Sequence, residues 1–253
     1  MIFTNQRDEF DRRGLLQLSA AVSAGAAKQM RQRLWQHLEH AEGALPDRPE
    51  TWRVVAPAHF QALTRSGAFA AMASATLLTA IDGLLGKAGW QAPQRWGRPL
   101  VTFPEDTPWH LPARGWHQDS SDRPGDPALV AFACLAPVLP QGGGTLVVAG
   151  SHRLTEPGTR YAGLRSAEVR DRVAADHPWF RDLLTPNREP DRTARLLAGT
   201  CLVDGIALEI LELTGDTGDA FLMHPRLMHA VASNALGTPR LMLLQFVHGP
   251  VVT

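Results

Sequence analysis

The spacing of apolar residues changes at Pro99, and this change constrains the fold more than any other feature of the sequence. Before Pro99, apolar residues recur at helical spacing; after it, they form short runs separated by Gly, Pro and Asp. Short apolar runs bounded by turn-forming residues are typical of strands in a sandwich or barrel. The runs occupy residues 100–103, 129–135, 145–148, 207–213, 220–223 and 241–247. We therefore expect a mainly β domain with flanking helices.

Two helical segments precede these strands. Between Ser19 and Gly43, apolar side chains recur every four residues and line one face of a helix, which Ser19 would cap and Gly43 would end. A second helical stretch is expected over residues 60–85, before Gly86. Residues 154–198 lie between the predicted strands and show patterns typical of short helices. We therefore interpret this segment as an insertion between two strands. A segment this long in a compact domain is typically a lid or a binding element.

The length of 253 residues fits a single domain, in which residues 1–98 are mainly helical support and residues 99–253 form the barrel. Hydrophobic residues make up 44% of the chain, and 25 basic side chains balance 25 acidic ones. This composition argues against disorder and against a basic nucleic-acid surface. We expect a small-molecule substrate, no nucleic-acid or membrane partner, and a monomer or homodimer.

The chain begins with mixed acidic and basic residues, and no apolar run reaches the length of a membrane span. A cytoplasmic location is therefore expected. Cys134 and Cys201 form no CxxC pair, which disfavours a zinc site or thiol exchange. We expect both thiols to be reduced and structural.

The segment GWHQD contains the first candidate metal ligands. His117 and Asp119 lie two residues apart, so an extended strand would place both side chains on the same face. A later segment, DAFLMHPRLMHAVASN, offers His224 and His229 as a third ligand. Two histidines and one carboxylate on one face of an iron ion leave positions open for co-substrate and dioxygen. An HxD pair by itself is weak evidence, since a hydrogen-bonded histidine before a turn would look the same.

Four segments in order, GWHQD, GGGTLVVAGSHR, GDAFLMHPRLMHAVASN and PRLMLLQF, make the chain resemble the phytanoyl-CoA dioxygenase family of iron- and 2-oxoglutarate-dependent oxygenases. The resemblance extends over roughly residues 96–246. It implies a double-stranded β-helix, a jelly-roll barrel of the cupin type with flanking helices, which agrees with the strand and helix pattern. It also implies that His117, Asp119 and His229 are the catalytic metal ligands, with His224 in a supporting or turn position.

The family likeness further assigns the co-substrate site. Arg240 follows His229 by eleven residues and would bind the distal carboxylate of 2-oxoglutarate through its planar guanidinium. Thr145 and Thr102 are further candidates for hydroxyls near the co-substrate. Some relatives carry a serine two residues after the distal histidine, where this chain has Val231. Ser233 or Thr102 would then have to replace that hydroxyl.

The resemblance implies iron(II) as cofactor, with 2-oxoglutarate and dioxygen as co-substrates. The expected reaction hydroxylates an aliphatic C–H of a small metabolite, with decarboxylation of 2-oxoglutarate to succinate. Because Asp119 is present, halogenation is disfavoured, whereas desaturation, cyclisation and epoxidation would use the same ligands. The substrate is expected to contact residues 109–116, residues 120–127 and the insertion.

Two alternatives stay open at the level of sequence. A cupin-like metal enzyme that does not use 2-oxoglutarate would keep the three ligands and would not need Arg240. A non-catalytic binding protein with the same barrel fold would be recognised by the loss of a ligand or of the arginine, and neither residue type is missing here.

Overall fold

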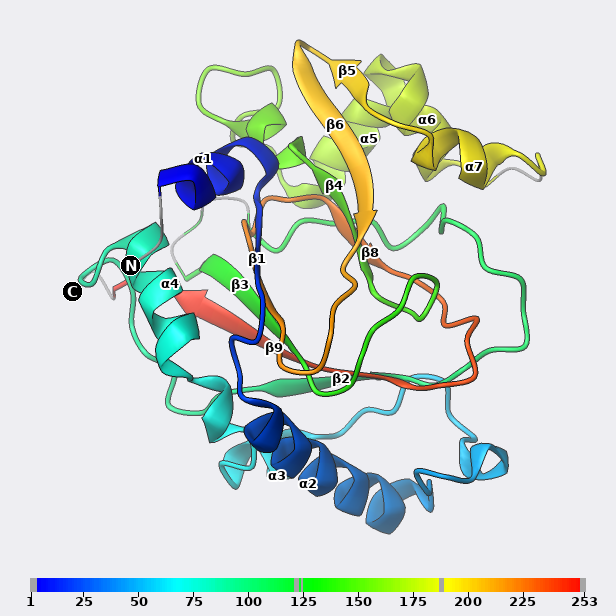
Figure 1. The fold of residues 1–253 in the computed structure, drawn as a ribbon. Helices are drawn as coiled ribbons and strands as arrows, with labels where there is room; N and C mark the ends of the chain where they lie inside the picture. Colours follow the sequence, from blue (N-terminus) through cyan, green and yellow to red (C-terminus); the bar gives the residue numbers. More distant parts are fainter. Residues whose placement is uncertain (1–3, 121–122, 124, 187–188, 251–253) are drawn as a thin grey trace.

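The computed structural model describes residues 4–120, 123, 125–186 and 189–250, and its core consists of two facing antiparallel sheets. The larger sheet has the strand order β1-β7-β3-β9-β2, and the smaller one has the order β5-β6-β4-β8 (Figure 1). The strands of the larger sheet are β1 (Leu15–Leu18), β7 (Ala220–Met223), β3 (Pro127–Cys134), β9 (Arg240–His248) and β2 (Arg98–Thr102). Those of the smaller sheet are β5 (Cys201–Val203), β6 (Ile206–Glu212), β4 (Thr145–Ala149) and β8 (His229–Val231).

Side chains from both sheets meet in an apolar interior. Phe132 of β3 and Met242 of β9 lie in one buried cluster with Val147 of β4, because alternate residues of a strand point to the same face. The opposite face of the larger sheet packs against the N-terminal helices. This arrangement confirms the predicted mainly β, jelly-roll architecture with flanking helices.

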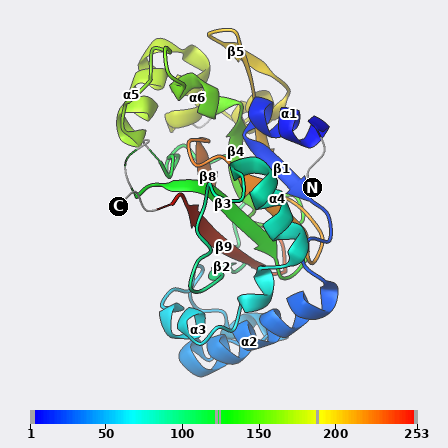
Figure 2. The same cartoon turned by 90° about the vertical axis from the view of Figure 1, so that its left-hand side faces the viewer.

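The helices cover the two outer sides of this sandwich. The first group is α1 (Thr4–Arg13), α2 (Ala24–Glu42), α3 (Gln61–Arg65) and α4 (Ala75–Leu85), with short 3₁₀ turns at Pro49–Thr51 and Ala70–Met72. The second group is α5 (Ser166–Asp176), α6 (Pro178–Leu184) and α7 (Arg192–Leu197), preceded by a 3₁₀ turn at Ser151–Thr155. Figures 1 and 2 show α2 and α3 on one side of the sheets and α5 and α6 on the other.

The predicted helix between Ser19 and Gly43 is present with a later start. Ser23 caps α2 by accepting a hydrogen bond from the backbone N–H of Ala26, whereas Ser19 lies in a turn outside the helix. Ala20 has φ 47°, a left-handed conformation that a helix cannot include. Gly43 ends the helix in the left-handed conformation, as predicted.

The second predicted helix, over residues 60–85, is wrong as one element. The segment folds into α3, a 3₁₀ turn and α4, separated by Gly67 at φ 78° and by Ser74. The Ser74 side chain caps α4 by accepting a hydrogen bond from Leu77 N, so a new helix starts where continuation was expected. Within the described residues, no helix is both long and apolar enough to cross a membrane.

The six predicted apolar runs correspond to β2, β3, β4, β6, β7 and β9. Three strands were not predicted: β1, β5 and β8. The insertion, residues 154–198, contains α5, α6 and α7, whose apolar side chains pack with the outer face of β4 and β6 in a second buried cluster. Cys134 is buried and Cys201 half-buried, and both are free thiols.

Candidate metal centre

The two candidate histidine ligands are held together by their backbones. His117 N donates to His229 O at 2.9 Å, and His229 N donates to His117 O at 2.9 Å. His229 belongs to β8 and pairs with Val147 of β4, so its side chain points into the space between the sheets. His117 forms an isolated bridge and not the regular strand that the HxD spacing suggested. This exchange of two hydrogen bonds nevertheless fixes both rings side by side, with centroids 4.2 Å apart.

Asp119 completes the cluster. Its Oδ1 lies 3.8 Å from Nε2 of His117, and its Oδ2 lies 3.4 Å from Nε2 of His229. One ligand atom from each of the three residues lies within 4.8 Å of the other two. The loop is held in place because the backbone N–H groups of Asp119 and Ser120 both donate to Pro225 O. Among the described residues, no other group of histidine, cysteine and acidic side chains has metal-binding spacing.

Both rings present Nε2 to the shared point. Nδ1 of His117 lies 2.8 Å from Gly115 O, and Nδ1 of His229 lies 2.9 Å from Leu227 O. A carbonyl oxygen only accepts, so Nδ1 carries the proton of the neutral ring and Nε2 keeps its lone pair. Burial lowers the pKa of His229, with Asp119 acting in the opposite direction. Burial thereby favours the neutral imidazole that metal binding requires.

The donor set fits a divalent ion such as iron(II). Ligands at about 2.1 Å from a metal and at right angles to each other are about 3 Å apart, slightly closer than the atoms here. Oδ2 of Asp119 is buried and has no hydrogen-bond partner among the described residues. A buried carboxylate oxygen without a donor is costly, and a bound cation would satisfy it. The side chain of His117 is 49% exposed, which leaves one side of the site open.

Arg240 lies buried at the start of β9, 3% exposed. Its Nη2 donates to Thr102 Oγ1 at 2.8 Å, whereas Nε and Nη1 have no acceptor among the described residues. Burial lowers the pKa of Arg240 to about 10, and Glu212 acts in the opposite direction. Glu212 itself accepts hydrogen bonds from two backbone N–H groups. A buried guanidinium with unused donors fits the distal carboxylate of a dicarboxylic co-substrate.

Comparison with known proteins places this geometry in a family. The family model described as Phytanoyl-CoA dioxygenase (PhyH) matches residues 10–242, which include the three candidate ligands and Arg240. The chain belongs to the phytanoyl-CoA dioxygenase family. The sequence resemblance on the four ordered segments is thereby confirmed, and it extends further toward the N-terminus than those segments.

A curated protein and several solved structures are also similar to this chain. An L-proline trans-4-hydroxylase from Streptomyces griseoviridis is 29% identical over 140 residues, 54% of this chain and 46% of that protein, so the chain covers less than half of this curated relative. HygX from Streptomyces hygroscopicus, with nickel and 2-oxoglutarate bound, has a TM-score of 0.55 and 18% identity over 100% of this chain and 88% of its own. EctD from S. alaskensis, with 2-oxoglutarate and 5-hydroxyectoine, has a TM-score of 0.55 and 20% identity over 96% and 75%. At these identities, the two structures support the fold.

The missing serine of the phytanoyl-CoA dioxygenase pattern is replaced by an exposed side chain. Val231 is 58% exposed and pairs with Thr145 across β8 and β4. Thr145 is buried, but no hydrogen bond from its hydroxyl to Arg240 is present. The Ser233 hydroxyl is buried without a partner among the described residues. Of the three candidate hydroxyls, the structure therefore brings Thr102 to the arginine.

His224 lies outside the metal cluster. Its Nδ1 accepts a hydrogen bond from Arg226 N in a turn, and its ring packs against His152 with centroids 4.8 Å apart. His152 is the histidine of the GSH segment and is 3% exposed. The placement agrees with the turn position predicted for His224.

Two residues that support this region, Ser166 and Glu212, were not singled out from the sequence. The backbone N–H of Gln118, between the two ligands of the HxD segment, donates to Ser166 Oγ of α5 at 2.7 Å. Glu212 braces the turn before β4 through Gln141 N and Gly144 N. Ser166 is the first residue of α5, and the helical pattern that begins there was the only sequence signal that pointed toward it. Of the predicted substrate loop over residues 120–127, positions 121, 122 and 124 lie outside the described residues.

Proposed function

We propose that the protein is an iron(II)- and 2-oxoglutarate-dependent oxygenase that hydroxylates an aliphatic C–H of a small metabolite. The observation that carries the proposal is the combination of two features in one barrel. His117, Asp119 and His229 converge with metal-binding spacing, and a buried guanidinium, Arg240, offers unused donors. The first feature suits iron(II), and the second suits the far carboxylate of 2-oxoglutarate.

The residues divide the work between holding and orienting. His117, Asp119 and His229 would hold iron(II), and the exposed side of His117 would leave room beside it for 2-oxoglutarate and dioxygen. Arg240, oriented by its hydrogen bond to Thr102, would bind the other end of 2-oxoglutarate. When bound, the metal and co-substrates supply the oxidising chemistry. The net reaction converts substrate, dioxygen and 2-oxoglutarate into hydroxylated product, succinate and carbon dioxide.

The apolar interior contributes by keeping water from the reacting atoms. Phe132, Val147 and Met242 are each at most 1% exposed and belong to the cluster between the two sheets. A dry, low-dielectric interior strengthens the charge pairing of Arg240 with a carboxylate. The relative from Streptomyces griseoviridis is named a proline hydroxylase, which supports hydroxylation over the other outcomes that the same ligands permit.

Arg240 also separates this proposal from a cupin-like metal enzyme without 2-oxoglutarate. Burying a guanidinium that lacks a carboxylate partner costs several kcal/mol on the order-of-magnitude scale for buried ions. An enzyme that used only the three ligands would gain nothing from that cost. We further propose a cytoplasmic location and a monomeric or homodimeric state. The balance of 25 basic and 25 acidic side chains supports only the part of the proposal that concerns nucleic acid, since it argues against a basic nucleic-acid surface. Light scattering after size-exclusion chromatography tests the oligomeric state.

Anaerobic titration tests the proposed function. Iron(II) and 2-oxoglutarate added together should produce the weak visible charge-transfer band of the chelated complex, and neither should do so alone. Arg240→Ala should require much more 2-oxoglutarate for the same band, while its metal binding stays intact. A wild-type protein that binds iron(II) without any band would overturn the assignment in favour of an enzyme that does not use 2-oxoglutarate.

A further inference from the structure

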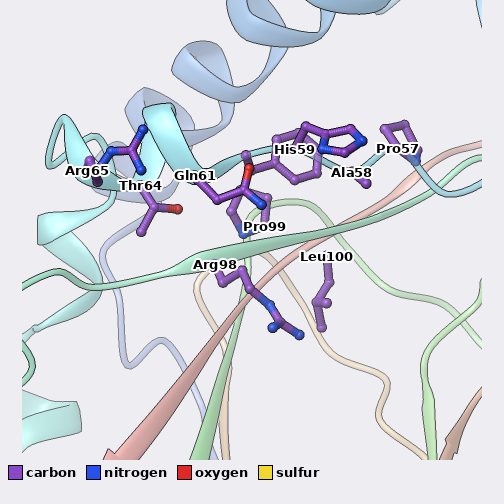
Figure 3. Close-up of a pocket in the computed structure, with 10 residues that line it drawn as sticks. Pro57, Ala58, His59, Gln61, Thr64, Arg65, Arg98, Pro99 and Leu100 are labelled. Atoms are coloured by element: carbon purple, nitrogen blue, oxygen red, sulfur yellow. The ribbon is translucent and has the colours of Figure 1, made fainter.

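A cavity of about 580 Å³ lies along the edge strand β2, on the side away from β9 (Figure 3). One wall is α3 with the loop before it, including Gln61 and His59, and the other wall is Arg98, Pro99 and Leu100. A second cavity of about 440 Å³ shares Arg98 with the first and continues toward Phe246. We call the two cavities together the β2 groove.

The β2 groove is positively charged. Arg65 and Arg98 line the first cavity, Arg95 and Arg98 line the second, and no Asp or Glu occurs among the described residues that line either. Arg95 donates to the backbone carbonyls of Arg65 and Gln94. By contrast, no carboxylate of the described residues forms an ion pair with Arg65 or Arg98. Arg65 and Arg98 therefore line the groove without an ion-pair partner among the described residues, and Figure 3 shows their side chains on opposite sides of β2.

Arg98 lies on edge strand β2, on the interior face of the larger sheet. It pairs with Leu244 of β9, so both side chains lie on the face of the sheet that looks into the interior. Its guanidinium carbon lies 5.9 Å from the centre of the Phe246 ring. Stacking on an aromatic face holds the guanidinium plane and leaves its N–H edge available for an oxyanion. Figure 3 shows Arg98 and Leu100 on the side of β2 opposite to Pro99 and α3.

The same face of β2 leads to the co-substrate anchor. Arg98, Leu100 and Thr102 alternate along the strand, and Thr102 is the residue that contacts Arg240. Leu100 lines the groove and also packs against the interior apolar cluster. Four residues of extended strand span about 13 Å. An anion at Arg98 and the carboxylate at Arg240 would thus bind at opposite ends of β2, with the apolar side chain of Leu100 between them.

We propose that the β2 groove binds the anionic end of the primary substrate, with Arg98 as the specificity-determining residue. The substrate class is a small molecule with an apolar body and a terminal oxyanion, either carboxylate or phosphate. Its apolar part passes Leu100 toward the interior between the sheets, and its charged end stays at Arg98. This inference rests on the proposed function, because it assigns the groove to the substrate of the same metal centre.

Binding of simple amphiphiles tests the proposal without knowledge of the substrate. Hexanoate, hexyl phosphate and 1-hexanol are titrated by calorimetry into anaerobic protein loaded with iron(II) and 2-oxoglutarate, so that Arg240 is already occupied. Both anions should bind. The affinity for hexanol should be at least about tenfold lower, since hexanol lacks the charged group that accepts hydrogen bonds from Arg98. The tighter of the two anions identifies the oxyanion that the groove prefers.

Variants assign the effect to the groove. Arg98→Gln should weaken anion binding about tenfold and leave hexanol binding unchanged. Arg65→Gln should change anion binding little, because Figure 3 shows Arg65 on the other side of β2. Arg12→Gln is the matched control, because Arg12 is an exposed arginine of α1, and Figure 1 shows α1 at the opposite end of the molecule from β2 and α3. All variants should melt at the wild-type temperature. Anion binding that is unaffected by Arg98→Gln, or weakened equally by Arg12→Gln, overturns the proposal.

The charge-transfer band separates this result from the proposed function. If the band forms and no Arg98-dependent anion binding is found, the groove assignment is wrong while the oxygenase assignment stands. If wild-type protein gives no band and Arg98-dependent binding persists, the groove is an anion site and the oxygenase assignment is wrong.

Discussion

Arg240 and Thr102 are register partners on neighbouring strands, and Nη2 of the arginine donates to the threonine hydroxyl at 2.8 Å. The threonine thereby occupies one end of the guanidinium and sets its plane. Nε and Nη1 stay without an acceptor among the described residues. A planar fork with fixed orientation and free donors is suited to a carboxylate. This relationship links the sequence position eleven residues after His229 to a defined chemical role.

Replacing Arg240 should affect 2-oxoglutarate selectively. In Arg240→Ala, the buried carboxylate would lose its partner, at roughly 3–5 kcal/mol or about a hundredfold or more in affinity. Arg240→Lys should recover only part of this loss, since an ammonium lacks the planar fork. Steady-state kinetics should show a large rise in KM for 2-oxoglutarate and a small one for the primary substrate. An unchanged KM for 2-oxoglutarate would place the co-substrate anchor elsewhere.

Thr102 should act through the arginine. Thr102→Val keeps the shape and removes the acceptor, so the guanidinium can rotate, and KM for 2-oxoglutarate should rise about fivefold, the value of one hydrogen bond. Thr102→Ser keeps the hydroxyl and should stay near wild type. If both substitutions have the same effect, the role of Thr102 is packing. The double variant Thr102→Val with Arg240→Ala should be no worse than Arg240→Ala alone.

The metal ligands should separate clearly from the nearby histidine. His117→Ala, Asp119→Ala and His229→Ala should each abolish turnover and weaken iron(II) binding, with little change of fold, whereas His224→Ala should retain metal. The reason is that His224 hydrogen-bonds to its own turn and lies outside the cluster. Metal content after dialysis and circular dichroism report the two effects. Retention of iron by His229→Ala together with its loss in His224→Ala would reverse the assignment.

The fold should lose stability in mild acid because of the His152–His224 pair. Burial lowers the pKa of His152 to about 4 and that of His224 to about 3. Arg226 and Arg153 also lower the pKa of His152, and His152 and Arg226 also lower that of His224. A backbone hydrogen bond with Asp11 partly opposes this for His152. Histidines of the unfolded chain have a pKa of about 6.5. Below a pH of about 6.5 the unfolded chain therefore binds more protons than the folded protein.

The expected loss begins as the pH falls through about 6.5 and continues toward the folded pKa values, at about 1.4 kcal/mol per pH unit for each histidine. Above about pH 7 the pair contributes no pH dependence, because both rings are neutral in both states. Urea unfolding of metal-free protein between pH 7 and 4.5 measures this. His152→Gln should reduce the slope by one proton relative to wild type. An unchanged slope would assign the acid sensitivity to other groups, such as His229.

The parts of the fold that sequence predicted are those with local signals. The six predicted strands are apolar runs with turn residues on both sides, and Gly43 ends a helix because of its own backbone freedom. The missed strands depend on partners. β1 lies in a charged N-terminal region and is a strand because it pairs with β7. β8 is three residues long and is defined by its pairing with β4.

The candidate site shows the same division. The HxD pair, His229 and Arg240 lie in short motifs that the family resemblance identified, and the fold brings them together. Arg98 was not singled out from the sequence, because its significance depends on Phe246 and on the lack of carboxylates among the described residues that line the groove, which are properties of tertiary structure. Ser166 is comparable, since its contact with Gln118 spans 48 residues of sequence.

The insertion provides the last prediction, because it contacts the metal-binding segment directly. Ser166 Oγ accepts from the backbone N–H of Gln118, and Arg192, 5% exposed, donates to Leu111 O just ahead of that segment. These contacts identify α5 and α7 as a brace for the HxD ligands, and a folding lid over the site stays a prediction. Complete removal of residues 154–198 would also expose the apolar cluster on β4 and β6, so a point substitution is the sharper test.

Ser166→Ala should leave the Gln118 N–H without its acceptor, at a cost of about 1–3 kcal/mol borne by the ligand segment. Iron(II) affinity should fall about tenfold, and consumption of 2-oxoglutarate should exceed product formation, because His117 and Asp119 are held less rigidly. Ser166→Thr retains a hydroxyl and serves as the control. Hydrogen exchange at residues 115–120 should rise in the alanine variant and stay near wild type in the threonine variant. If exchange, iron affinity and coupling are all unchanged in Ser166→Ala, the insertion is a packing element without influence on the metal site.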